Sequence, residues 1–413
     1  SNTDAIAMGL EAISSGQSST AIGRSSSATA NYGTSLGANA SATAARSTAV
    51  GYLSKSNQTD SSAFGSQAQA TGVESTAVGV SSAASADQST AIGGNSRASQ
   101  SGAIAVGFGS KAQGEGSTAM GLDANAMASE SIAVGNSSIA SEFASSALGY
   151  RAQATGNQAT AVGAGSSASG MNSSAFGRGS KAEGELSTAV GYNASATKEN
   201  SAAFGGNAQA LGNESTAVGA RSIACGDESS AFGRGSTAEG KESTAVGYEA
   251  IASAEDSSAF GKSAKASGKE STAVGYEAIA SAEDASAFGK SAVASGEQSI
   301  AVGYDVEALG TNSAAFGMKA VATQENSMAI GANASSRIAN ATAIGTNASA
   351  MRKLGGSQSS ITLGAAGNGT TDYFLPGLAN KPGESAQING TQYLTVDEDG
   401  QIIVGQAEVA PNV

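Results

Sequence analysis

The sequence predicts an all-β solenoid with two short strands in each 14-residue coil and about 25 coils. Three observations support this fold class. First, a glycine recurs at every fourteenth position from Gly9 to Gly345 without insertion or deletion. Second, an apolar residue always precedes this recurring glycine, and alanine precedes that residue everywhere except at Ser35. Third, aromatic residues are only 5% of the chain and tryptophan is absent, so a conventional globular core is not expected.

The repeat is clearest in the segment 243–256, which returns almost unchanged as 271–284. A sister segment lies between them and carries Phe260 where the first copy carries Val246. Between residues 162 and 316 the apolar position alternates valine and phenylalanine without exception. The translational unit in that part of the chain is therefore a pair of coils.

The repeat favours strands over helices. A glycine in every unit would cost a helix interior roughly 1 kcal/mol each. In the stretch 244–246, threonine and valine share one face of a strand while alanine takes the other, and 250–252 alternates in the same way. We expect two strands of about five residues per coil. The turns follow the recurring glycine and a second glycine such as Gly240, since glycine tolerates positive φ.

Stacked coils place equivalent strands in parallel, at about 4.8 Å per coil, which predicts a rod on the order of 120 Å long. We expect the valine–phenylalanine column to fill the narrow interior and the alanine columns to form flat apolar stripes outside. Such stripes favour packing against copies of the same chain over a monomeric rod. Because threonine shares the face expected to be buried, an outward threonine ladder of the ice-binding kind is not favoured.

The residue inventory argues against an enzyme, a metal site or a bound cofactor. The chain has no histidine and one cysteine, Cys225. Lys262-Ser263 imitates the end of a phosphate-binding loop, but Asp256 stands where that loop needs a glycine. The acidic run 397–399 is interpreted as a solvated hairpin turn, with calcium binding as the alternative. A net charge of −13 argues against a nucleic-acid partner and against contact with anionic lipid by this segment.

The units Ser-Thr-Ala-Val-Gly-Tyr and Ser-Ser-Ala-Phe-Gly, each followed by an Ala-x-Ala segment, resemble the head repeats of YadA-type trimeric autotransporter adhesins over residues 4 to about 350. The resemblance implies a left-handed parallel β-roll, a homotrimer, and display from the outer membrane of a Gram-negative bacterium. It also implies adhesion, with a role in virulence, to matrix proteins such as collagen, to host cells or to abiotic surfaces.

The tail departs from the family pattern. We assign residues 1–350 to the head β-roll and 351–413 to a non-repeat β cap or connector with a hairpin near 392–404. Neither a heptad stalk nor amphipathic barrel strands are evident in the chain. We therefore expect either that an anchor was removed or that another fibre has borrowed the repeat.

The predicted function is multivalent attachment of a surface-exposed trimer. Ligand contacts should fall on outward positions that vary between coils, and the candidate residues are Lys181, Ile251, Lys265 and Ile279. The alternative is a non-adhesive structural segment, either a phage tail-fibre shaft or an extracellular filament subunit.

Overall fold

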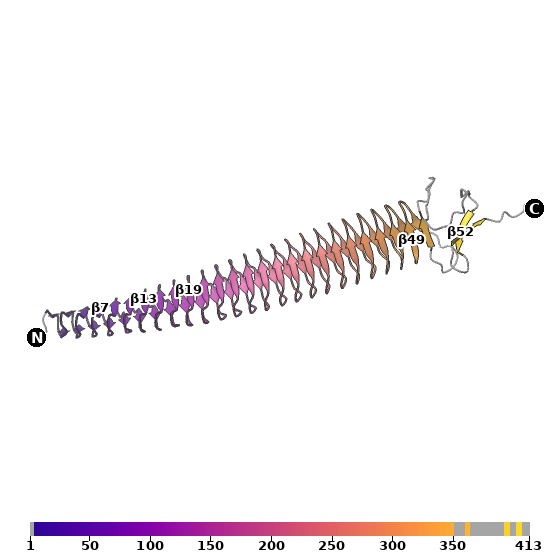
Figure 1. Ribbon diagram of the computed structural model, residues 1–413. Coiled ribbons are helices and arrows are strands. Elements are labelled where there is room, and N and C mark those ends of the chain that lie inside the picture. Colours follow the sequence, from indigo (N-terminus) through magenta and orange to yellow (C-terminus); the bar gives the residue numbers. More distant parts are fainter. Residues whose placement is uncertain (1–3, 351–359, 364–391, 397–401, 407–413) are drawn as a thin grey trace, which may run out of the picture.

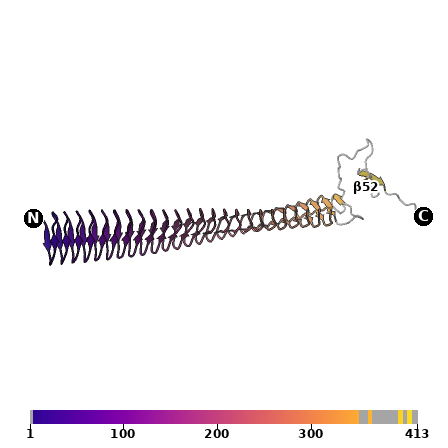
Figure 2. The ribbon, with the colours of Figure 1, turned by 90° about the horizontal axis from the view of Figure 1, so that it is seen from below.

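The computed structural model describes residues 4–350, 360–363, 392–396 and 402–406. The repeats form a long rod of stacked coils, with the first coil at one end of the rod and the coil near residue 350 at the other (Figures 1 and 2). About 25 turns of parallel β-solenoid are present, as predicted. No helix occurs among the described residues, and they contain no apolar helix long enough to cross a membrane.

Two parallel sheets run the length of the rod. The odd-numbered strands, which form sheet A, begin with β1 (Ile6–Met8) and recur once per coil to β47 (Met328–Ile330), followed by β49 (Ala341–Ile344) and β51 (Ser360–Leu363). The even-numbered strands, which form sheet B, begin with β2 (Ile13–Ser14) and recur at the same interval to β50 (Ser349–Ala350). The strands of sheet A up to β47 have three residues and those of sheet B have two, fewer than the five expected.

In both sheets, each strand pairs with the equivalent strand of the next coil. In sheet A, β35 (Thr244–Val246) pairs with β37 (Ser258–Phe260), so that Val246 lies beside Phe260. In sheet B, β36 (Ile251–Ala252) pairs with β38 (Lys265–Ala266). Hydrogen bonds continue through the turns, since the amide of Gly261 donates to the carbonyl of Val246 at 2.8 Å. Neighbouring coils are thus linked around most of their circumference.

The interior is filled by alanine and serine, and the prediction that valine and phenylalanine fill it is wrong. Ala245, Ala250 and Ala252 are fully buried, whereas Val246 is half-buried and Phe260 is 38% exposed on the outside. The two sheets lie so close together that only small side chains fit between them. Val306 is the largest side chain that is fully buried.

Serine supplies the polar part of this interior. Ser243 is fully buried, and its hydroxyl donates a hydrogen bond to the carbonyl of Gly240 at 2.7 Å. Equivalent serines recur in most coils, and about half of the coils show the same contact, as Ser215 does with Gly212 at 2.7 Å. Other serines of the column, such as Ser229 and Ser271, are buried without a hydrogen-bond partner. Because a buried hydroxyl without a partner is costly, the serine contacts that do form help to fix the shape of the turn.

Threonine faces outward, contrary to the expectation that it would be buried with valine. Thr244 and Val246 both point away from the interior of the roll. The threonine column is not continuous, since Ser258 and Ala202 occupy it in other coils. The reason given against an ice-binding ladder is therefore wrong, although the interrupted column does not form one.

The recurring glycine has a geometric cause. Gly121 has φ = 132°, and a Cβ atom built on it would lie 2.6 Å from the carbonyl oxygen of Gly135 in the next coil. Glycines at the position of Gly240 in the second turn do not have positive φ, so that part of the turn prediction is wrong. The left-handed residue of that turn lies two positions later, for example Glu242 with φ = 57°.

The C-terminal segment is described only in part. Strand β51 adds to sheet A beside β49. Strands β52 (Gln392–Val396) and β53 (Ile402–Gln406) pair in antiparallel fashion. The acidic turn 397–399 lies outside the described residues, and the division at residue 350 and the cap function stay predictions.

Candidate interaction surfaces

The first surface is the outer side of sheet A, here called the A face. Two side chains per coil point outward from it, at the positions of Thr244 and Val246. No charged residue occupies either position in any coil from β1 to β49. The phenylalanines at the second position are 36–41% exposed, so the A face is an uncharged, largely apolar stripe along the whole rod.

The second surface is the outer side of sheet B, here called the B face. All four predicted contact residues lie on it, at the same position of their coils. Lys265 is exposed, and it lies between the half-buried Ile251 and Ile279 on adjacent strands. Lys181 is also exposed but belongs to β26 (Lys181–Ala182), six coils away. The structure therefore brings three of the four residues together.

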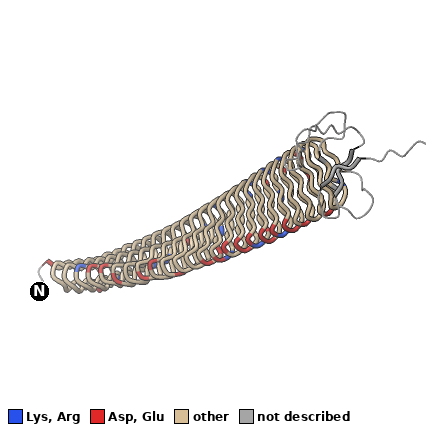
Figure 3. The backbone as a smooth tube through the Cα atoms, turned by 45° about the vertical axis from the view of Figure 1, so that its right-hand side comes forward, with Lys and Arg blue, Asp and Glu red and all other residues tan. Residues whose placement is uncertain are grey.

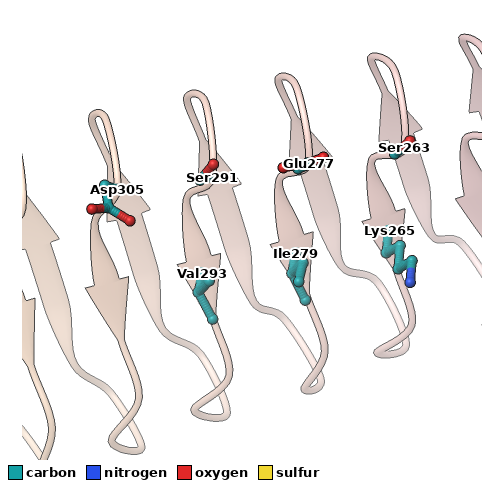
Figure 4. A pocket seen from close by; sticks show the side chains of 7 residues that line it. All are labelled: Ser263, Lys265, Glu277, Ile279, Ser291, Val293 and Asp305. Carbon is teal, nitrogen blue, oxygen red and sulfur yellow. The ribbon is translucent and has the colours of Figure 1, made fainter.

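A shallow groove runs over four coils of the B face (Figure 4). One row of side chains comes from the turn and a second row from sheet B, and together these residues are Ser263, Lys265, Glu277, Ile279, Ser291, Val293 and Asp305. Ile279 and Val293 form an apolar floor, with the Glu277 and Asp305 carboxylates along one side. Val293 and these two acids were not among the predicted contacts, although the 14-residue period places Val293 beside Ile279 and Asp305 two coils after Glu277.

The turn after the recurring glycine forms one edge of the roll, here called the tyrosine edge. Between residues 248 and 304 tyrosine alternates with lysine in successive coils. The Lys262 ammonium lies 5.7 Å from the ring centroid of Tyr248 and 5.3 Å from that of Tyr276. Arg234 lies 5.6 Å from the other side of Tyr248. Such cation–π contacts contribute about 0.5–1 kcal/mol each at exposed sites. Hydrogen bonding to Glu277 raises the pKa of the Tyr276 phenol.

The second turn forms the opposite edge, here called the acidic edge. Its left-handed position is acidic in six successive coils, and these residues are Glu214, Glu228, Glu242, Asp256, Glu270 and Asp284. Acidic residues accordingly form a line along one edge of the rod (Figure 3). Lysines relieve part of the repulsion, since the Lys241 ammonium lies 2.7 Å from Glu242. Hydrogen bonding to Glu242 raises the pKa of Lys241.

No arrangement suited to catalysis or metal binding is apparent in the described part of the chain. No three acidic or cysteine side chains there are grouped closely enough to hold a metal ion. The Cys225 thiol is free, and partial burial raises its pKa, so it is protonated near neutral pH. What the rod offers chemically is repeated shallow contact surfaces.

Comparison with protein families agrees with this geometry. The YadA head domain repeat (2 copies) matches residues 1–26, 14–40, 28–54, 42–68, 56–82, 70–96, 84–110, 98–124, 112–138, 140–166, 168–194, 196–222, 224–250, 252–278, 280–305 and 308–334. These matches cover most of the chain, and the protein belongs to the family of YadA-type adhesin heads. It is a family of structural adhesins rather than enzymes. No curated protein matches the chain significantly.

Proposed function

We propose that the chain is the head of a homotrimeric surface adhesin, with the A faces turned toward the trimer axis and the B faces turned outward. The difference between the two faces carries this proposal. The A face is uncharged over its whole length, whereas the B face carries Lys181, Lys265 and Glu307 among other variable residues.

The A face needs a partner of matching length. An exposed apolar stripe that runs along a whole rod is unusual on a soluble monomer. Two further copies of the same chain provide such a partner, because each carries the same stripe with the same spacing. The family assembles as homotrimers in general, which supports three copies rather than two.

Attachment then follows from repetition. A groove such as that around Ile279 is too open to bind a small molecule tightly, but related positions recur at every coil and on every chain. Weak contacts made together increase overall affinity without any single strong site. We assign the outward contacts to Lys181, Ile251, Lys265 and Ile279, and the targets to matrix proteins such as collagen, host cells or abiotic surfaces. Display from a Gram-negative outer membrane is part of the same proposal.

A binding assay with matched variants tests the adhesive function. The purified trimer is applied to immobilised collagen, fibronectin and laminin, and to a blocked surface. Binding should fall at least about tenfold in the B-face variant Ile251→Asp/Lys265→Glu/Ile279→Asp, which corresponds to about 1.4 kcal/mol. The matched control Ser27→Asp/Ser41→Glu/Ser167→Asp alters the same sheet position in other coils. A trimer that binds none of the surfaces would favour the structural fibre segment instead.

A further inference from the structure

We propose, resting on the proposed trimer, that the tyrosine edge of one chain docks against the acidic edge of the next chain around the ring. The contact joins two different surfaces of the same protein. Its cations are Arg234, Lys262 and Lys290 on the tyrosine edge, and its carboxylates are the acidic residues between Glu214 and Asp284 on the other edge. The turns of the tyrosine edge also contain the acidic residues Glu249, Glu277 and Asp305.

Cyclic symmetry brings these edges together. Each coil has two faces and two edges. If three parallel rods place their A faces toward one axis, the first edge of each rod meets the second edge of its neighbour. Head-to-tail contacts of this kind close into rings. The inference therefore follows from the orientation of the A face together with the position of the two turns.

The charges occur in the same part of the rod. Lys262 and Glu270 belong to one coil, and Asp256 lies half a coil before Lys262 on the opposite edge. The same offset relates Glu228 to Arg234 and Asp284 to Lys290. In three chains at equal height, each cation of the tyrosine edge thus meets a carboxylate of the neighbouring acidic edge.

The acidic edge also has an unbalanced charge within its own chain. Lys241 and Lys269 pair with Glu242 and Glu270 at 2.7 and 3.4 Å, but Asp256 makes no ion pair in the described residues. Stacked like charges in adjacent coils repel one another. Cations supplied by a neighbouring chain would relieve this repulsion.

The two edges also select the direction of packing. Consider an antiparallel pair of rods with their A faces in contact, related by a two-fold axis along the strand direction. In this pair each edge lies beside the same edge of the other chain. Acidic edges would then meet each other, and like charges brought together disfavour that arrangement. Parallel rods avoid this, so the charge pattern specifies a parallel assembly.

Charge reversal with rescue tests the contact. The variant Arg234→Glu/Lys262→Glu/Lys290→Glu reverses one edge, and Glu228→Lys/Asp256→Lys/Asp284→Lys reverses the other. The third protein carries all six changes. The control Lys111→Glu/Lys181→Glu/Lys265→Glu makes the same change in net charge on the B face. Sedimentation velocity over a range of concentrations measures assembly, and circular dichroism measures the folding of each chain.

We expect each single-edge variant to dissociate at a concentration at least about tenfold higher than the natural chain does. The protein with all six changes should regain most of the lost affinity between chains. The B-face control should dissociate at the same concentration as the natural chain. A loss caused only by broken cation–π contacts within one chain would not be rescued, and that result overturns the proposal. Unchanged assembly of both single-edge variants overturns it as well. A natural chain that is monomeric would instead refute the trimer of the proposed function.

Discussion

Ala245 and Val246 are neighbours in β35, yet their side chains lie on opposite sides of the roll wall. Ala245 is fully buried between the sheets, and Val246 lies on the A face beside Phe260. The same division holds in the equivalent sheet A strands from β3 (Thr20–Ile22) to β49. The interior of the roll therefore accepts only small residues, while the large apolar residues of sheet A point outward onto the A face.

Enlarging the interior residue should destabilise the roll. For Ala245→Leu we expect the free energy of unfolding to fall by about 1–3 kcal/mol or more, because the closely spaced sheets leave no room for the added atoms. Urea unfolding followed by circular dichroism, at a fixed protein concentration, measures the change.

The neighbouring position provides the control. Val246→Leu adds volume outside the roll and should leave the folding of a single chain nearly unchanged, within about 0.5 kcal/mol. If Val246→Leu were the more damaging of the two substitutions under dissociating conditions, the assignment of interior and surface would be reversed.

Two glycines should respond differently to alanine. Gly121 has φ = 132°, and a Cβ atom on it would lie 2.6 Å from the carbonyl oxygen of Gly135. Gly121→Ala should therefore lower the free energy of unfolding by at least about 2 kcal/mol. Gly206 has no neighbouring atom within 4 Å of a Cβ, and Gly206→Ala should be neutral or slightly stabilising. Equal effects of the two substitutions on the unfolding midpoint would contradict the role given to the recurring glycine.

The left-handed position of the second turn offers a stabilising change. Leu186 occupies it with φ = 56° and is 50% exposed, so little burial is lost on substitution. Leu186→Asn should raise the free energy of unfolding by about 0.5–1 kcal/mol, because asparagine tolerates this conformation better. The reciprocal change, Asn200→Leu at φ = 53°, should lower it by a similar amount. A gain from both changes would show that another effect dominates.

One ion pair predicts a response to acid. The Arg46 guanidinium donates to both carboxylate oxygens of Asp60, at 2.5 and 2.6 Å, and this hydrogen bonding lowers the pKa of Asp60 below its ordinary value of 3.8. A carboxylate with a lowered pKa stabilises the folded state above that ordinary value. Its contribution is lost as the pH falls below about 3.8 through the pKa of the folded state.

Melting curves between pH 7 and pH 2 measure this contribution. Asp60→Asn should lower the melting temperature at neutral pH, and its difference from the natural chain should shrink in acid. Glu115, an exposed residue with no ion pair in the described residues, gives the control Glu115→Gln. A difference for Asp60→Asn that stays constant with pH would rule out the ion pair as its source.

The period of the sequence was enough to predict the coil, the parallel register and the alternation within each strand. Val246 and Phe260 are one coil apart in the sequence, and the structure pairs them in sheet A as the period predicts. The inward face could not be chosen by hydrophobicity, since valine and phenylalanine are the more apolar residues. The small distance between the two sheets determines which face of the strand points inward. In the sequence, the nearly constant alanine at positions such as Ala245 indicates this face.

The surfaces were predicted less completely than the fold. Lys265 and Ile279 were assigned outward on the B face, where the structure places them. The tyrosine edge was missed because residues in turns were interpreted one coil at a time. Tyr248 and Lys262 occupy equivalent positions in adjacent coils, and stacking brings them into contact. The acidic edge escapes prediction for the same reason.

Thiol accessibility tests whether the A face is buried between chains. In a Cys225→Ser background, single cysteines replace Val246 on the A face and Ile251 on the B face, and each reduced protein is treated with a maleimide. We predict rapid labelling at position 251, and slow labelling at position 246 that becomes rapid only when the trimer dissociates. Equally rapid labelling of both positions in the assembled protein would contradict the burial of the A face between chains.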